Sequence, residues 1–385
     1  MKLTSGINFV NYKTRIKISV IKKNLAFLLK EKNQIIKSLS KNYKNSFDNK
    51  KINKYKSFLN YNVIGMGGST LGTQAIYDFL KNKISKKFTF IDNLQASNKP
   101  NKEKRSANLV ISKSGNTIET IVNANILIKK KDYNIFLTEN NESYLYLLAK
   151  KLKAEIIHHN NYIGGRYSVL SEVGMLPAEL MGLNSNNFRQ LNNLVKNKNF
   201  LNALISNVSS TLYFMKNRKF NSIIINYDKN SENLFNWYQQ LIAESLGKKK
   251  KGILPIISNM PKDNHSVMQL YLDGFENNFF TFFYVNNKKS LKMNNKLVLP
   301  SQNYLKNKDI NKIIFLQKKA TENVFKKKKI PFRSFEINQR NEKTLGELFC
   351  FFILETILLG KSLNLNPYDQ PAVELIKKET KNLLI

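Results

Sequence analysis

A hydroxyl-rich turn from residue 112 to residue 120 could do chemistry. It contains Ser112, Lys113, Ser114 and Thr117, and it lies between an apolar run of strand length and a helix-compatible stretch. Backbone N–H groups at a helix start, three hydroxyls and an ammonium could all point at one dianion there, assisted by the helix dipole. This pattern predicts a phosphate site. An ordinary helix N-cap, for which Ser and Thr are also preferred, is the alternative at this stage.

A glycine-rich turn, Gly65-Met-Gly-Gly-Ser69, follows another apolar run and also leads into a helix. Glycines at such a turn allow a backbone to approach a ligand closely. The spacing matches neither a dinucleotide fingerprint nor a Walker loop, although Asp92 could serve weakly as the acidic residue of the former. Both turns are expected at carboxyl ends of strands, where open α/β sheets bind ligands, so Ser69 joins the phosphate candidates.

Two further patterns place charged residues where a ligand could meet them. Gly164 and Gly165 precede Arg166, which favours an arginine that projects from a tight turn toward a ligand over a purely structural ion pair. Gln240 and Glu244 are four residues apart, so they share one face of a helix. The apolar neighbours of Glu244 would favour its neutral form, which suits a general base, whereas a surface glutamate paired with lysines is the plainer alternative.

A last pattern lies near the carboxyl end of the chain. Gln370 and Lys377 are separated by seven residues, or two helical turns, and therefore share a face. Taken alone, Lys377 would be interpreted as a solvated lysine.

Net charge raises the possibility of nucleic-acid binding, since the chain carries a formal charge of +36. Its lysines are spread along the whole chain among many asparagines and isoleucines, rather than gathered in one basic stripe. The runs 248–251 and 326–329 are typical of solvated helix ends. This distribution argues against nucleic acid as the primary partner.

Cysteine content and hydropathy limit the class of protein. The single cysteine, Cys350, lies in an apolar run and is expected to be a buried, inert thiol. No run of about 20 uncharged apolar residues and no signal-like start occurs, so we expect a cytoplasmic protein without a membrane span.

Alternation of strand-length apolar runs with helix-compatible segments predicts α/β architecture with parallel sheets flanked by helices. The alternation restarts in the second half, which favours two similar domains in tandem. We expect a helical arm over 1–53, a first domain over 54–190, a second over 191–345 and C-terminal helices over 346–385. The expected strands are 62–65, 88–92, 109–112, 133–138, 154–157, 221–227, 252–258, 279–285 and 331–337.

Five motifs in this order resemble the glucose-6-phosphate isomerase family over residues 61–384. They are Gly-x-Gly-Gly-Ser, Ser-Lys-Ser followed by Thr-x-Glu-Thr, Gly-Gly-Arg-Tyr-Ser, Gln-x-x-x-Glu-Ser-x-Gly-Lys, and the terminal Asn-Pro-Tyr-Asp-Gln block with its lysine. The resemblance implies two flavodoxin-like sugar-isomerase domains and a homodimer whose active site is shared between subunits. It also implies interconversion of glucose 6-phosphate and fructose 6-phosphate without a metal or organic cofactor.

The resemblance also implies roles for individual residues. Glu244 would move the proton between C2 and C1 through a cis-enediol, and Arg166 would stabilise the developing negative charge. His265 would open the sugar ring from the partner subunit, with Lys377 assisting. The remaining positions would bind phosphate or orient the sugar: Ser69, Ser112, Lys113, Ser114, Thr117, Gly165, Gln240 and Gln370.

Other functions remain open from the sequence. A non-catalytic sensor of sugar phosphates would not need Glu244, His265 and Lys377 together. A related isomerase of aminosugars would normally carry an N-terminal glutaminase with a nucleophilic cysteine, and this sequence starts Met1-Lys2 without one.

Overall fold

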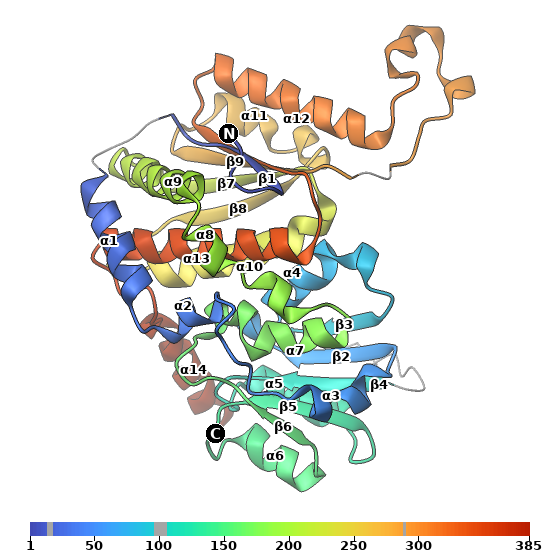
Figure 1. Ribbon diagram of the computed structural model, residues 1–385, viewed down its shortest axis with the longest axis vertical. Coiled ribbons are helices and arrows are strands. Elements are labelled where there is room, and N and C mark those ends of the chain that lie inside the picture. Colours follow the sequence, from blue (N-terminus) through green and yellow to red (C-terminus); the bar gives the residue numbers. More distant parts are fainter. Residues whose placement is uncertain (14–17, 96–105, 288–289) are drawn as a thin grey trace.

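Two five-stranded sheets, one above the other in Figure 1, form the frame of the chain. The computed structural model describes residues 1–13, 18–95, 106–287 and 290–385. The first sheet is wholly parallel and has the order β3-β2-β4-β5-β6, which is the flavodoxin-like order 2-1-3-4-5. Its strands are β2 (Asn60–Gly65), β3 (Lys87–Ile91), β4 (Ser106–Ile111), β5 (Tyr133–Thr138) and β6 (Glu155–His158).

Helices cover both faces of the first sheet. Successive residues of each strand point to opposite sides, so apolar residues on both faces need helices to bury them. Ile64 and Val110 pack with residues of α5 and α6, whereas Val63 and Leu109 belong to the large core shared with α4 and α7. The helices around this sheet are α3 (Asn49–Lys56), α4 (Leu71–Phe79), α5 (Ile118–Leu127), α6 (Tyr144–Leu152) and α7 (Glu172–Leu180).

The second sheet has the same strand order, except that its last position is taken by a strand from the N-terminal segment. Its order is β8-β7-β9-β10-β1, in which four strands are parallel and β1 runs antiparallel to β10, with Ile7 opposite Ile337. All eight residues of β9 are buried, as expected for a central parallel strand. The strands are β1 (Ile7–Val10), β7 (Asn221–Asn226), β8 (Leu254–Asn259), β9 (Asn278–Val285) and β10 (Phe332–Ile337).

The N-terminal segment differs from the helical arm that the sequence predicted. Besides α1 (Ser19–Lys30), α2 (Gln34–Ser38) and α3, it contributes β1 to the far sheet. The polar composition of the segment hides a four-residue strand with alternating burial, whose partner lies at the other end of the chain. The nine strands that the sequence predicted are all present, each with ends within a few residues of those expected.

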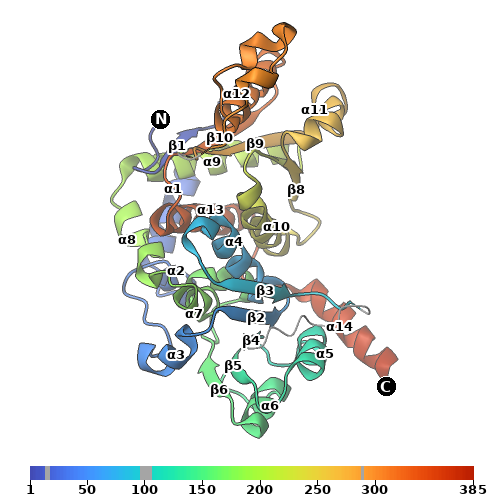
Figure 2. The same ribbon diagram turned by 90° about the vertical axis from the view of Figure 1, so that its right-hand side faces the viewer.

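A long buried helix, α13 (Glu342–Ser362), runs between the two sheets (Figures 1 and 2). Asn341 caps it by accepting a hydrogen bond from the Thr344 backbone N–H, and residues 344–360 are all buried. A helix that is largely apolar around its circumference is typical of such a position, and its buried Glu355 is paired with Arg333. Cys350 lies inside it and is buried, as expected, and burial raises the pKa of this thiol to about 12, which disfavours the reactive thiolate.

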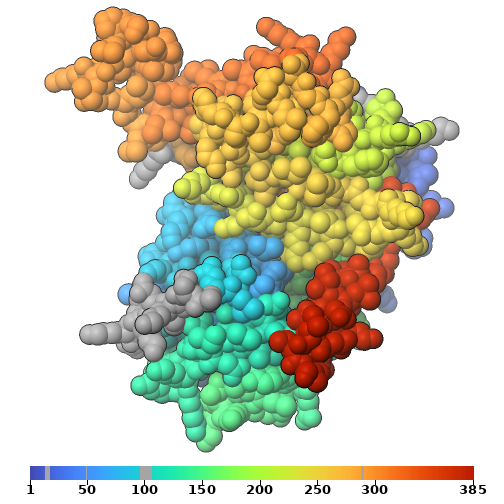
Figure 3. Space-filling model, turned by 180° about the vertical axis from the view of Figure 1, so that it is seen from behind, coloured from blue at the N-terminus to red at the C-terminus, as the bar shows by residue number. Residues whose placement is uncertain are grey.

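The remaining helices of the second half are α8 (Leu191–Leu194), α9 (Lys198–Lys216), α10 (Glu232–Leu246), α11 (Met268–Asp273), α12 (Ile310–Lys327) and α14 (Pro371–Leu384). Every residue of α14 is exposed, and the helix stands out from the surface in Figure 3. The excursion formed by residues 290–309, directly before α12, projects from the upper part of the molecule in Figure 3 and exposes Leu291, Leu297 and Leu299. Among the described residues, no helix has the length and apolar character needed to cross a membrane.

Candidate active site

Two glycine turns touch each other at the carboxyl end of the first sheet. The turn after β2 contains Gly67, with φ of +53°, and Gly68. A Cβ atom on Gly68 would lie 2.2 Å from the carbonyl carbon of Gly165, and one on Gly67 would lie 2.8 Å from Nε2 of Gln240. Only glycine allows this approach, so the turn after β2, the turn before Arg166 and helix α10 meet at one point.

Arg166 lies at the centre of this contact and is almost fully buried. Its Nε donates to Ser245 Oγ at 2.8 Å, and its Nη2 donates to the carbonyl oxygens of Pro367 and Asp369 at 2.8 and 3.0 Å. Its Nη1 donates to Gln370 Oε1. Neutral acceptors from two segments, α10 and the loop before α14, therefore fix the guanidinium plane, and its positive charge remains directed at one carboxylate.

That carboxylate belongs to Glu244, whose Oε2 lies 3.1 Å from Nη1 of Arg166. Its Oε1 accepts a hydrogen bond of 2.7 Å from Nε2 of Gln240, one helical turn earlier on α10. The side chain is 26% exposed, so the carboxylate is fixed in place yet reachable from solvent. Its partners are a cation and an amide, rather than the apolar neighbours that the sequence suggested.

The hydroxyl-rich turn connects β4 with the start of α5. Ser112 Oγ lies 3.0 Å from Thr117 Oγ1, and Gly115 adopts φ of +64° between them. Thr117 is the N-cap residue of α5, but its side chain makes no capping hydrogen bond. The ordinary-cap alternative therefore does not account for these hydroxyls, which face each other at the N-terminus of a ten-residue helix, where anions are favoured.

Neighbouring residues complete this edge. Ser114 Oγ accepts from the Asn116 backbone N–H at 3.3 Å, and Ser69 is half-buried in η1 (Gly67–Ser69) after β2. The Lys113 ammonium donates to the Asn161 carbonyl at 2.8 Å and lies 3.3 Å from Glu139 Oε1. β2 and β4 are the pair at which the strand order reverses, so both turns flank the switch point of the sheet.

Two candidates lie apart from this network. His265 ends η6 (Lys262–His265), an exposed segment after β8 of the second sheet. Lys377 is exposed on α14, and its ammonium lies 2.7 Å from Glu374 of the same helix. In the described part of the chain, no hydrogen bond or ion pair joins either residue to Glu244 or Arg166. Gln370, by contrast, reaches Arg166 from the loop before α14.

Three residues that were not predicted as site residues hold Arg166 and its neighbours in place: Tyr167, Trp237 and Ser245. Ser245 Oγ also lies 2.8 Å from the Tyr167 hydroxyl, which donates to Pro367 O, and Trp237 donates to the Arg166 carbonyl at 3.1 Å. The only sequence signal for Ser245 was its place directly after Glu244. Nothing in the sequence indicated that Trp237, a core residue, fixes the arginine backbone.

The histidine pair 158–159 has no place in this network. His159 is buried, its Nδ1 lies 2.8 Å from the Asn160 carbonyl oxygen, and its Nε2 has no partner in the described structure. Burial lowers the pKa of His159 to about 4, so the ring is neutral near pH 7.

Fold and site together define a sugar-isomerase architecture, in which two flavodoxin-like sheets support polar turns at a switch point. The phosphoglucose isomerase family model matches residues 12–254. A glucose-6-phosphate isomerase of Methanocaldococcus jannaschii is 33% identical over 85% of this chain and 85% of its own length. The chain belongs to the phosphoglucose isomerase family.

Other relatives agree. A glucose-6-phosphate isomerase of Mycoplasmopsis pulmonis is 31% identical over 84% of this chain and 82% of its own length. Among solved structures, a hypothetical protein of Thermus thermophilus matches with a TM-score of 0.80, 20% identity and coverage of 95% of this chain and 94% of that one. A glucose-6-phosphate isomerase of Chlamydia trachomatis matches with a TM-score of 0.68, 18% identity and coverage of 95% and 74%. At these identities, the two structures support the fold alone.

Proposed function

We propose that the chain interconverts glucose 6-phosphate and fructose 6-phosphate at the site built around Arg166 and Glu244. Family membership gives the reaction. The observation that carries the site is the pairing of a carboxylate, fixed by Gln240 and Arg166, with a buried guanidinium beside the switch point. Aldose–ketose exchange needs both a base and a nearby positive charge.

Glu244 takes the proton from C2 of the open-chain aldose and returns it to C1, while the hydroxyl proton on O2 moves to O1, so that the carbonyl group passes from C1 to C2. The same carboxylate can perform both transfers, because C1 and C2 are adjacent in the cis-enediol and the base lies over one face of both carbons. Negative charge develops on the enediolate oxygen during the transfer, and Arg166 stabilises it. Because its neutral partners already hold the guanidinium rigidly, little reorganisation is needed when the charge appears.

The phosphate is proposed to bind at the hydroxyl-rich turn. Ser112 and Thr117 supply facing hydroxyls, the N-terminus of α5 supplies its dipole, and Ser114 and Ser69 lie on the same edge. Lys113 contributes positive charge, although its ammonium is shared with Glu139. Phosphate bound there would place the other end of a six-carbon chain toward the Arg166 network, to which the glycine turn after β2 connects.

The complete site is proposed to require a homodimer. His265 is exposed and unconnected to Glu244 in its own chain, which is consistent with a ring-opening residue supplied by the partner subunit. Exposed apolar residues on α14, including Leu375 and Ile376, and the leucines of the excursion before α12 offer surfaces that a second copy would cover. Lys377 would join the site only if α14 packs against it in the dimer.

A coupled assay tests the proposed activity. Purified protein is supplied with fructose 6-phosphate, and the glucose 6-phosphate that forms is oxidised by its dehydrogenase while NADPH is recorded. We expect turnover that disappears in Glu244→Gln and persists in Glu232→Gln, a control on the same helix. Tight sugar-phosphate binding without turnover would instead identify a sensor.

A further inference from the structure

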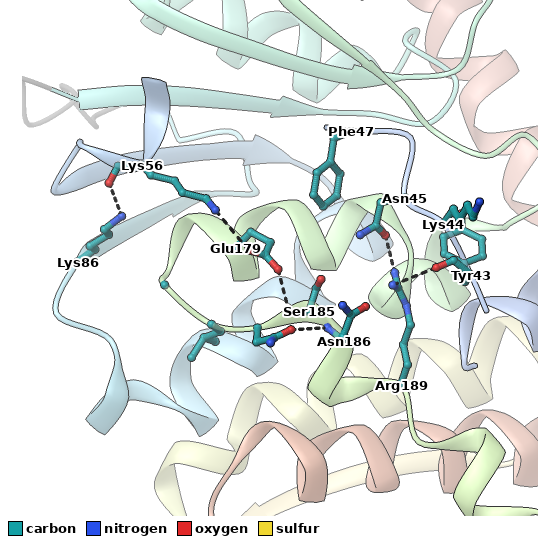
Figure 4. Close-up of a pocket in the computed structure, with 13 residues that line it drawn as sticks. Tyr43, Lys44, Asn45, Phe47, Lys56, Lys86, Glu179, Ser185, Asn186 and Arg189 are labelled. Carbon is teal, nitrogen blue, oxygen red and sulfur yellow. Dashed lines mark hydrogen bonds and ion pairs between the residues drawn. The ribbon is translucent and has the colours of Figure 1, made fainter. Parts of the chain in front are cut away.

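A cavity of about 550 Å³ opens at the end of the first sheet where its strands begin, away from the turns of the proposed substrate site (Figure 4). Lys86 lines it and directly precedes β3, and Lys56 lines it from the end of α3, just before β2. Strands therefore begin at this cavity, whereas Ser112 and the glycine turn follow strand ends. Its walls come from the segment around Tyr43, the end of α7 and the loop after it. The cavity is separate from the proposed substrate site.

Positive charge dominates the walls of this cavity. Lys44, Lys56, Lys86 and Arg189 contribute four cations, against the single carboxylate of Glu179. Glu179 is already engaged, because its Oε2 lies 3.5 Å from Lys56 Nζ and its Oε1 accepts from a backbone N–H at 3.0 Å. Burial and the neighbouring Lys56 lower the pKa of Lys86, as expected where two ammonium groups lie close together. An anion in the cavity would relieve this repulsion.

Arg189 provides the strongest indication of a missing anion. Its relative exposure is only 1%. Its Nη1 donates to the Tyr43 carbonyl at 3.3 Å, and its Nη2 donates to the Leu170 carbonyl at 3.2 Å and to Asn45 Oδ1. All three acceptors are neutral, and Nε has no partner in the described structure. Glu172 and Glu179 attract this guanidinium, but neither is in ion-pair contact with it in the described structure, so an anion bound against it would stabilise it further.

We propose that this cavity is a second binding site, for a small metabolite that carries a dianionic phosphate group. The cavity volume lies within the usual range for small-molecule sites. A planar guanidinium and the ammonium groups of Lys44 and Lys56 are donors suited to the acceptor oxygens of a phosphate monoester, whereas the Lys86 ammonium, which already donates to the Lys56 and Leu180 carbonyls at 2.7 Å, adds positive charge. A ligand here would not compete with the sugar phosphate, because the two sites lie at opposite ends of the strands.

Calorimetric titration with glycerol 3-phosphate tests the proposal. The protein carries Ser112→Ala and Thr117→Ala, which weaken the proposed substrate phosphate site, so that the tighter binding that remains reports the second cavity. We expect one saturable site per chain. Adding Lys44→Glu and Lys56→Gln should weaken binding by about tenfold or more, since each lost ionic hydrogen bond is worth roughly that factor.

A matched control separates a site from general charge. Lys50→Glu with Lys51→Gln makes the same change in net charge at exposed positions of α3, outside the cavity. We expect this control to bind within about twofold of its parent. Equal weakening in the control, or no saturable binding in the parent, would overturn the proposal.

Two further measurements complete the test. Malate, a dicarboxylate without phosphate, should bind at least tenfold more weakly than glycerol 3-phosphate, and equal binding would refute the assignment to phosphate. If the double cavity variant does not fold by circular dichroism, Lys44→Glu alone decides the matter, because Lys44 is exposed and outside the core. Binding unaffected by that single change would also count against the site.

Discussion

Replacing Glu244 with glutamine should remove the catalytic base while keeping the shape of the site. Wild-type Glu244 Oε1 accepts from Gln240 Nε2, and Gln240 Oε1 is buried without a partner. If the amide of Gln240 flips, it can accept from the new amide of residue 244, so the hydrogen bond is regained. The new carbonyl oxygen can still accept from Arg166. The variant is therefore expected to fold and to bind sugar phosphate.

The expected magnitudes follow from these contacts. A general acid–base group is worth about 10² to 10⁴ in rate, and we expect kcat to fall by that factor with little change in KM. Loss of the ion pair leaves the buried Arg166 guanidinium without its carboxylate, so the free energy of unfolding should fall by about 3 kcal/mol, the lower end of the range for breaking a buried pair.

Isotope exchange is the decisive assay for this variant. The protein is incubated in deuterium oxide with fructose 6-phosphate, and NMR follows deuterium entering C1 of the ketose and C2 of the glucose 6-phosphate formed. Exchange should fall together with turnover, while Glu232→Gln retains both. Exchange at the wild-type rate in Glu244→Gln would refute the assignment of Glu244 as the base, and loss of folding would refute the rearrangement inferred for Gln240.

Three other outcomes are expected. Ser112→Ala with Thr117→Ala should raise KM at least tenfold with kcat nearly unchanged, because hydrogen bonds to a charged group are worth about 1.5 to 3 kcal/mol each; an unchanged KM would contradict the phosphate placement. Mixing inactive Glu244→Gln with inactive His265→Ala subunits should restore activity, since one site of each heterodimer carries neither defect. Heterodimers that form without activity would place His265 outside a shared site. The free energy of unfolding should fall by about 3 kcal/mol as the pH drops from about 6.5 to 4, because protons then bind His159 in the unfolded chain but not the buried ring. The measurement is the denaturant midpoint at each pH. If the midpoint of His159→Gln falls by the same amount over this range, His159 is not the cause.

The positions of β2 to β10 were predictable because each of these strands contains a local apolar run. β9, with eight buried residues in sequence, is the clearest case, and α13 lies where the first of the expected C-terminal helices was placed. β1 was missed, since four residues in a polar segment are a strand only because β10 lies beside them. Pairing between distant segments leaves no local signal in either of them.

Site residues divide in the same way. The sequence identified Arg166, Glu244 and Gln370 one motif at a time, and the structure brings them into one network. The contact of Gly68 with Gly165 was not predictable, because it depends on two loops from different strands. The parts that His265 and Lys377 play stay predictions, since both depend on surfaces that a single chain leaves exposed.

The pairing of β1 with β10 has a consequence for biosynthesis. β1 leaves the ribosome long before β10 does, because β7, β8 and β9 of the same sheet are made in between. Until then β1 has no strand to join, and afterwards it closes the edge that β10 would otherwise present to other chains. The second sheet can therefore be finished only after β10 has been made, and a product that lacks β10 would release both an unpaired β1 and an incomplete sheet to aggregate.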